Sequence, residues 1–188
     1  MPVTEHMSPL TITRLIALLT IVGQAGLVLV ILGWPWRKTA LRAVYDFLSN
    51  QALFGAFLVV AGGVLGSLYF SEVAKFPPCE LCWFQRILMY PQLLLIGLAL
   101  AKKNRDVVLQ TLILSGLRAA IALYQVYLQF GGLAMVPCST TGLAASCSQK
   151  NFLEFGYITI PIMALTGFVM IIVAMMLHRR AAPTVETE

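Results

Sequence analysis

The sequence predicts an all-α membrane protein with five transmembrane helices. Hydrophobic residues make up 59% of the chain and charged residues only 11%, and the mean hydropathy is +0.85. A soluble domain carries about 25% charged residues. The net charge of +5 does not indicate nucleic-acid binding, because the charges cluster at the ends of apolar segments, which is the distribution that orients a chain in a bilayer.

Five apolar segments are long enough to be spans: residues 10–33, 51–74, 83–101, 107–130 and 157–177. A span needs roughly 20 apolar residues to cross ~30 Å of hydrocarbon. Open sheets leave backbone groups unpaired in lipid, so each segment is expected to be an α-helix. We expect the first segment to be retained as a helix, since no basic region precedes it and no small-x-small cleavage site follows it.

Basic residues between the spans predict the orientation of the chain, because Lys and Arg are enriched on the cytoplasmic side. They gather in the 34–50 and 102–106 connections and after the last span: Arg37, Lys38, Arg42, Lys102, Lys103, Arg105, Arg179 and Arg180. We therefore expect the N-terminus outside and the C-terminus in the cytoplasm.

This orientation would place all four cysteines outside the cytoplasm, where disulfides persist. Cys79 and Cys82 fall between the second and third spans, and Cys138 and Cys147 fall in the 131–156 connection. Four cysteines allow three pairings. Pairing within each connection is the simplest, and exchange between the two pairs is an alternative.

Three interpretations of the cysteines are open: two structural disulfides, a four-cysteine zinc site, and two redox couples that exchange electrons. A Cys79–Cys82 disulfide would close too short a loop to stabilise the fold much. The eight-residue gap between Cys138 and Cys147 is loose for one half of a zinc site. Redox exchange is favoured.

An arginine follows the first cysteine pair at helical spacing. Pro77 and Pro78 suit the start of a helix, so Cys79 and Cys82 are expected at its N-terminus, where free amides and the helix dipole favour a thiolate. Arg86 comes four residues after Cys82 and would lie one turn deeper on the same face. A charge at that depth needs a partner, such as a thiolate or a quinone carbonyl, unless it snorkels to the head groups.

A membrane quinone is the expected electron acceptor, since it takes two electrons as a dithiol gives two. The chain has no CxxCH haem motif and no nucleotide-binding fingerprint. Gln85 would assist Arg86. Trp83, Phe84 and Tyr90 would flank the quinone ring or belong to an interfacial aromatic belt.

Several polar side chains lie within the fourth span. Arg118 lies near its middle, where a charge is costly. A quinone or proton-path contact, a buried hydrogen bond to helix carbonyls and snorkelling are its alternatives, with function the less favoured. Tyr124, Gln125 and Gln129 line the outer half, and we expect polar contacts within the bundle rather than a quinone pocket.

The stretch GSLYFSEVAKFPPCELCWFQRILMYP at 66–91 resembles the signature of the DsbB/BdbC disulfide bond formation proteins, most closely the Gram-positive BdbC branch. VPC at 136–138 and FGYITIPIMAL at 155–165 resemble the second cysteine loop and last helix of that branch. The resemblance covers roughly residues 50–180. It implies a four-helix bundle in the bacterial plasma membrane that oxidises an extracytoplasmic thioredoxin-fold thiol oxidase (DsbA/BdbD-like). Electrons then pass to menaquinone or ubiquinone, which supports disulfide formation in exported proteins.

By position, the resemblance implies that Cys79 and Cys82 form the quinone-proximal pair, with Cys82 the thiolate nearer the quinone. Arg86 matches the arginine at the quinone. Cys138 and Cys147 match the pair that meets the partner. The chain would therefore be a thiol:quinone oxidoreductase; a non-catalytic membrane scaffold or a four-cysteine metal-binding protein is the alternative.

The span at 10–33 is additional to the family's four helices. We therefore expect an N-terminal helix with a basic connection at 1–49, a DsbB-like bundle at 50–180 and a cytoplasmic tail at 181–188. The small residues at 23–26 would permit close approach of another helix. The compact second cysteine loop would limit how far Cys138 can travel.

Overall fold

The computed structural model describes residues 9–102, 107–133, 147–150 and 152–181. The long helices are α1 (Pro9–Leu32), α2 (Arg42–Leu68), α3 (Glu80–Lys102), α4 (Val107–Gln129) and α5 (Ile160–Ala181). A 3-10 turn, η1 (Trp34–Lys38), follows α1, and a π-helical turn, η2 (Tyr69–Val73), extends α2. Among these described residues, five helices are long and apolar enough to cross a membrane, which confirms the five predicted spans.

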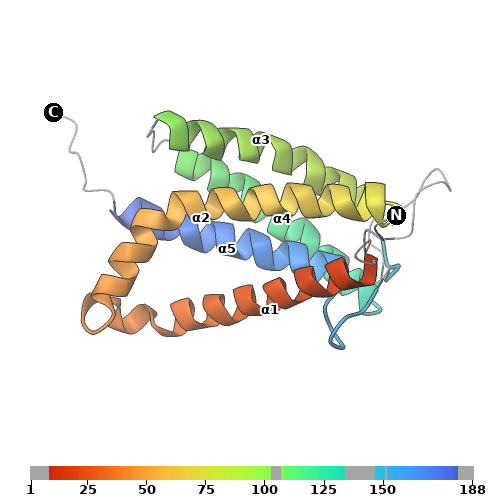
Figure 1. Cartoon of the computed structure of the whole chain (residues 1–188), viewed down its shortest axis with the longest axis horizontal. Helices are drawn as coiled ribbons and strands as arrows, with labels where there is room; N and C mark the ends of the chain where they lie inside the picture. Colours follow the sequence, from red (N-terminus) through yellow and green to blue (C-terminus); the bar gives the residue numbers. More distant parts are fainter. Residues whose placement is uncertain (1–8, 103–106, 134–146, 151, 182–188) are drawn as a thin grey trace, which may run out of the picture.

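Helices α2, α3, α4 and α5 form a bundle, and α1 lies beside it against α5 (Figure 1). Both α3 and α5 pack along α2 and α4. The main core contains aliphatic side chains and methionines from all four helices: Leu53, Ala56, Val60, Val64, Met89, Ile96, Val108, Ile171 and Met175. The predicted all-α architecture, with one helix before a four-helix bundle, is confirmed, and the orientation in the membrane stays a prediction.

Helix α1 approaches α5 closely at one of its predicted small residues. A Cβ atom on Gly23 would lie 3.0 Å from the sulfur of Met170, whereas one on Gly26 would meet open space. The Gln24 amide beside Gly23 donates a hydrogen bond to Thr166 Oγ1 at 3.0 Å. Within the small-residue patch, Gly23 therefore allows the close packing of α1 on α5, whereas Gly26 has no neighbouring atom at its Cβ position.

The second helix begins at Arg42 rather than at residue 51, so the predicted boundary was wrong. The polar residues in the first turns of α2 form contacts within this helix and with α1. Arg42 Nε lies 3.7 Å from Asp46 Oδ2, and Ser49 Oγ donates to the Tyr45 carbonyl at 2.7 Å. The Tyr45 hydroxyl donates to the carbonyl of Val30 in α1. The length of the apolar stretch therefore underestimates the length of this helix, because its first turns are polar and are stabilised by these contacts.

Arg118 lies fully buried within the bundle. Its guanidinium donates to Gln92 Oε1 and lies 3.9 Å from the ring centre of Phe168. The Gln92 amide in turn donates to Ser115 Oγ and to the Thr111 carbonyl. The buried hydrogen-bonded alternative for Arg118 is therefore correct in kind, although the acceptor is a side-chain amide rather than a helix carbonyl.

Candidate functional site

The first cysteine pair caps the N-terminus of α3. The Cys79 carbonyl accepts the first helical hydrogen bond, from the Trp83 amide at 3.2 Å, and the helix begins at Glu80. Cys79 is buried and Cys82 partly buried, and both are free thiols. Their sulfur atoms lie 2.9 Å apart. The double proline and the CxxC spacing thus place two thiols side by side at a helix end, as the sequence predicts.

The side chain of Gln125 in α4 touches both sulfur atoms. Its Nε2 donates to Cys79 Sγ at 3.2 Å and to Cys82 Sγ at 3.4 Å. Its Oε1 accepts a hydrogen bond from Gln85 Nε2 at 3.0 Å, and both amides are buried. Because Gln85 occupies the oxygen, the nitrogen of Gln125 is the end that faces the sulfur atoms. Gln125, oriented by Gln85, therefore presents a fixed hydrogen-bond donor to negative charge on the pair.

Arg86 lies buried one turn after Cys82 and is held by the end of α2. Its Nε donates to Ser67 Oγ at 2.8 Å and its Nη2 to the Ser67 carbonyl at 2.7 Å. Its guanidinium also lies 5.4 Å from the ring centre of Trp83. The π-helical turn η2 follows directly after Ser67 and Leu68. Arg86 is thus anchored within the protein rather than extended to the lipid head groups.

Cys79 is held in its protonated form. The hydrogen bond with Cys82, together with burial, raises the pKa of the Cys79 thiol above its usual value. The backbone N–H groups of Cys82 and Leu81 oppose this rise, and they are outweighed. A proton that stays on Cys79 can be shared with the sulfur of Cys82, so the reduced pair is asymmetric.

Part of the second predicted cysteine pair lies next to the first. Cys147 is disulfide-bonded and fully buried, and it packs in one cluster with Cys79 and Leu128. Cys138 lies outside the described residues. Gln129, one turn after Gln125, donates to the Gln149 carbonyl at 3.1 Å and ties this connection to α4. The fold therefore brings Cys147 to the end of the bundle that holds Cys79.

Aromatic side chains join the connections that carry the cysteines. Phe70, Phe76 and Phe152 pack ring against ring, with centroids 5.6 to 6.1 Å apart. On α3, Trp83, Phe84 and Tyr90 are exposed on the surface of the bundle. The three exposed rings suit contact with lipid, and the Trp83 ring lies beside Arg86.

Comparison with known proteins decides the family. The family model described as Disulfide bond formation protein DsbB matches residues 49–178. The chain belongs to the DsbB family. Within that family it is 41% identical over 130 residues to the Disulfide bond formation protein C of Bacillus subtilis, which covers 66% of this chain and 90% of the relative.

Other DsbB-family relatives give the same result. The Probable disulfide formation protein C 1 of Bacillus anthracis is 40% identical over 127 residues, or 66% of this chain and 88% of the relative. The protein of that type in Halalkalibacterium halodurans is 35% identical over 132 residues, or 68% of this chain and 93% of the relative. No solved structure matches the chain. These relatives support disulfide-forming oxidoreductase activity for a multi-pass membrane protein. Helix α1 and η1 precede the matched region.

Two polar contacts of the site were missed or underrated from the sequence. Gln125 was expected to make ordinary bundle contacts, yet it donates to both sulfur atoms. Ser67 was not singled out, although it holds Arg86 through its hydroxyl and its carbonyl. A signal was present in both cases, because each is a polar residue near the end of an apolar span that lies at the level of the CxxC pair.

Proposed function

We propose that this protein is a thiol:quinone oxidoreductase that reoxidises an extracytoplasmic thioredoxin-fold dithiol oxidase and delivers the electrons to a membrane quinone. The observation that carries the proposal is the sulfur pair at the start of α3, 2.9 Å apart, with the Gln125 amide donating to both atoms. Such an arrangement stabilises a thiolate next to its proton donor, which a structural disulfide does not require. Membership of the DsbB family supports the same class of chemistry.

The electrons would pass through two disulfide exchanges. A thiolate of the partner attacks the Cys138–Cys147 disulfide, and its second thiol resolves the mixed disulfide, leaving Cys138 and Cys147 reduced and the partner oxidised. These thiols then reduce a Cys79–Cys82 disulfide in the same way. Each step moves two electrons and breaks one S–S bond for each one formed. The place of Cys147 in one cluster with Cys79 and Leu128 supports a direct second step.

Within the reduced pair, Cys82 would carry the negative charge. Cys79 keeps its proton, because its pKa is raised by the hydrogen bond with Cys82 and by burial. Gln125 donates to Cys82 Sγ, and Arg86 adds positive charge one turn deeper on α3. Both groups favour the ionised sulfur. Cys82 is therefore the sulfur from which electrons leave, and Cys79 closes the disulfide.

The residues around Arg86 fit a quinone, which supplies an acceptor for two electrons and two protons when bound. Arg86 would hold a carbonyl oxygen of the quinone, and Gln85, its neighbour on α3, would assist it. Trp83, exposed on α3 and 5.4 Å from the guanidinium carbon of Arg86, would cover one side of the ring. Ser67 keeps Arg86 at this level by two hydrogen bonds. An apolar acceptor can reach the site from the lipid, where the aromatic face of α3 is exposed.

The order of exchange is testable by thiol trapping. The purified protein is mixed, without quinone, with a reduced thioredoxin-fold dithiol oxidase, quenched in acid and mapped for disulfides. We expect a mixed disulfide between the partner and the Cys138–Cys147 pair, followed by reduced Cys79 and Cys82. Cys147→Ser should block electron arrival at Cys79 and Cys82.

Two results would contradict the proposal. One is the absence of any mixed disulfide or of partner oxidation. The other is stoichiometric zinc in the native protein with all four thiols closed to alkylation, which would identify a metal-binding protein instead.

A further inference from the structure

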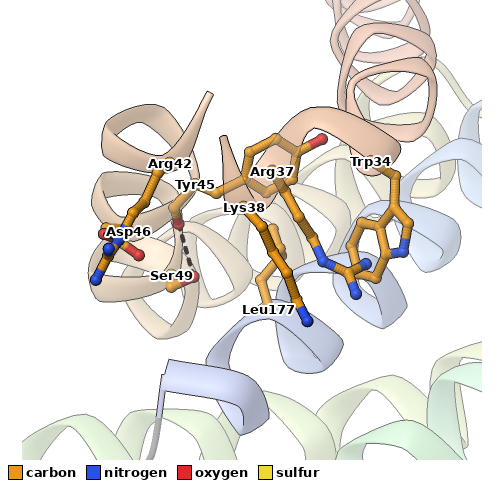
Figure 2. A pocket seen from close by; sticks show the side chains of 8 residues that line it. All are labelled: Trp34, Arg37, Lys38, Arg42, Tyr45, Asp46, Ser49 and Leu177. Atoms are coloured by element: carbon orange, nitrogen blue, oxygen red, sulfur yellow. Dashed lines mark hydrogen bonds and ion pairs between the residues drawn. The ribbon is translucent and has the colours of Figure 1, made fainter. Parts of the chain in front are cut away.

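A groove lies at the end of the bundle opposite the cysteine pair, where η1 leads into α2 and α5 ends (Figure 1). Its volume is about 490 Å³. Figure 2 shows the residues that line it: Trp34, Arg37, Lys38, Arg42, Tyr45, Asp46, Ser49 and Leu177. Three of these side chains are cationic and one is a carboxylate. The groove is formed mainly by the segment before residue 49, outside the region that matches the DsbB family.

Arg37 supplies an unused donor inside the groove. Its guanidinium lies 4.2 Å from the ring centre of Trp34. Its Nη1 atom is buried and has no hydrogen-bond partner among the described residues. Lys38 is exposed, and in Figure 2 its ammonium points to the same side as the Arg37 guanidinium. A buried guanidinium N–H without an acceptor is costly, and an anion would satisfy it.

The third cation is already compensated. Arg42 Nε lies 3.7 Å from Asp46 Oδ2, and Figure 2 shows this pair on the far side of the groove from Arg37 and Trp34. Within the described part of the chain, neither Arg37 nor Lys38 forms an ion pair. The positive charge available to a ligand is therefore concentrated on Arg37 and Lys38.

The walls of the groove are fixed by contacts that hold α1 to α2. The Tyr45 hydroxyl donates to the Val30 carbonyl of α1. The rings of Trp34 and Tyr45 meet edge to face with centroids 6.1 Å apart. Ser49 Oγ donates to the Tyr45 carbonyl at 2.7 Å. Trp34 and Tyr45 are amphipathic side chains of the kind found at the membrane surface. The site is thus largely formed before a ligand arrives.

We propose that this groove binds a phosphate-bearing anion at the membrane surface, with Arg37 and Lys38 as its donors. Basic pockets between transmembrane helices are suited to phospholipid head groups. The planar guanidinium of Arg37 suits two phosphate oxygens, and the Lys38 ammonium adds a point charge. A phospholipid head group and a free phosphate share this chemistry. The proposal does not depend on the electron transfer proposed above, because its measurement is ligand binding.

Trp34 lies in the groove and provides the measurement. Trp36→Phe and Trp83→Phe leave Trp34 as the sole tryptophan of the three in the chain. The purified protein in neutral detergent is titrated in one arm with dihexanoyl phosphatidylglycerol and in the other with inorganic phosphate. We expect saturable change in Trp34 fluorescence. If the lipid saturates the signal and inorganic phosphate does not, the ligand is a phospholipid head group. If inorganic phosphate saturates the signal, the ligand is a soluble phosphate.

Matched variants distinguish binding in this groove from attraction of the anion to general positive charge on the surface. Each basic residue near a membrane surface contributes about 1 kcal/mol, so Arg37→Gln with Lys38→Gln should weaken binding at least about tenfold. Lys102→Gln with Arg179→Gln removes the same charge from exposed residues at the same end of the bundle and should change binding less than about twofold.

A single substitution and a folding control make the binding result interpretable. Lys38 is exposed, so Lys38→Gln keeps the fold and should weaken binding about fivefold. The helical circular dichroism of every variant should match that of the parent. No saturable signal with either ligand would overturn the proposal. So would equal losses in the groove pair and the control pair.

Discussion

Gln125 is the residue with the most direct hold on the sulfur chemistry. Its amide donates to Cys79 at 3.2 Å and to Cys82 at 3.4 Å, while Gln85 fixes its orientation from α3. A hydrogen bond to a charged group is worth about 1.5–3 kcal/mol, so Gln125→Leu should lower turnover about tenfold or more. The thiolate absorbance of the reduced protein should also appear at higher pH. Gln110→Leu is the control, because Gln110 is an exposed amide on the same helix, away from the sulfur atoms. Equal effects of the two variants would contradict the role of Gln125.

Cys79 gives a second prediction at the residue scale, which concerns pH. Its pKa is raised, first by the hydrogen bond with Cys82 and then by burial. Cys79 therefore stays protonated as the pH rises through the ordinary thiol range, and alkylation of Cys79 in the reduced protein should be slow there. Cys82→Ser removes the largest cause, so the pKa of Cys79 should fall toward its usual value and its alkylation should begin at lower pH. Mass spectrometry of the alkylated peptides over a pH series measures this. An unchanged pH profile would contradict the account of the pair.

At the scale of elements, the end of α2 sets the position of Arg86. Ser67 contributes a hydroxyl and a carbonyl to the guanidinium just before the π-helical turn η2. Ser67→Ala removes the acceptor of the Arg86 Nε hydrogen bond, which costs about 1–3 kcal/mol when the donor stays buried. We expect a higher KM for a short-chain quinone, with the rate of partner oxidation in single turnover unchanged. Ser49→Ala is the control, since Ser49 is a buried serine of the same helix whose hydroxyl donates to the Tyr45 carbonyl, away from Arg86. A Ser67→Ala enzyme with parental KM would show that Arg86 needs no such support.

Helix α1 holds the connection that precedes α5. The Tyr157 hydroxyl donates to Gln24 Oε1 at 2.7 Å, and the Gln24 amide donates to Thr166 at 3.0 Å. Arg14 Nε lies 3.7 Å from Glu154 Oε2. Interhelical hydrogen bonds in membranes average about 0.6 kcal/mol each, so Gln24→Leu should lower the free energy of unfolding by about 1 kcal/mol. Hydrogen exchange at residues 154–158 should accelerate. Gln110→Leu alters an exposed amide of α4 and is the control. Unaltered exchange in the Gln24 variant would contradict this function of α1.

At the scale of the whole molecule, the features that depend on residues close together in the sequence were predictable. Apolar length requires the five spans, and the prolines with the CxxC spacing place Cys79 and Cys82 at a helix start. Arg86 follows from helical periodicity on the same element. Gln125 was harder to predict, because its contact with the sulfur atoms depends on how α4 is rotated against α3. The contact of Ser67 with Arg86 depends likewise on how α2 packs against α3. Such contacts between elements are set by packing, and the sequence of one element does not specify them.

The reduction of quinone is the measurement that tests the central claim most directly. The protein in lipid nanodiscs is mixed anaerobically with a reduced thioredoxin-fold dithiol oxidase and a short-chain quinone, and quinol and partner disulfide are counted together. We expect equal amounts of the two products, and we expect Cys82→Ser to abolish quinol formation. Oxidation of the partner without quinol, or quinol formation that survives Cys82→Ser, would contradict the claim.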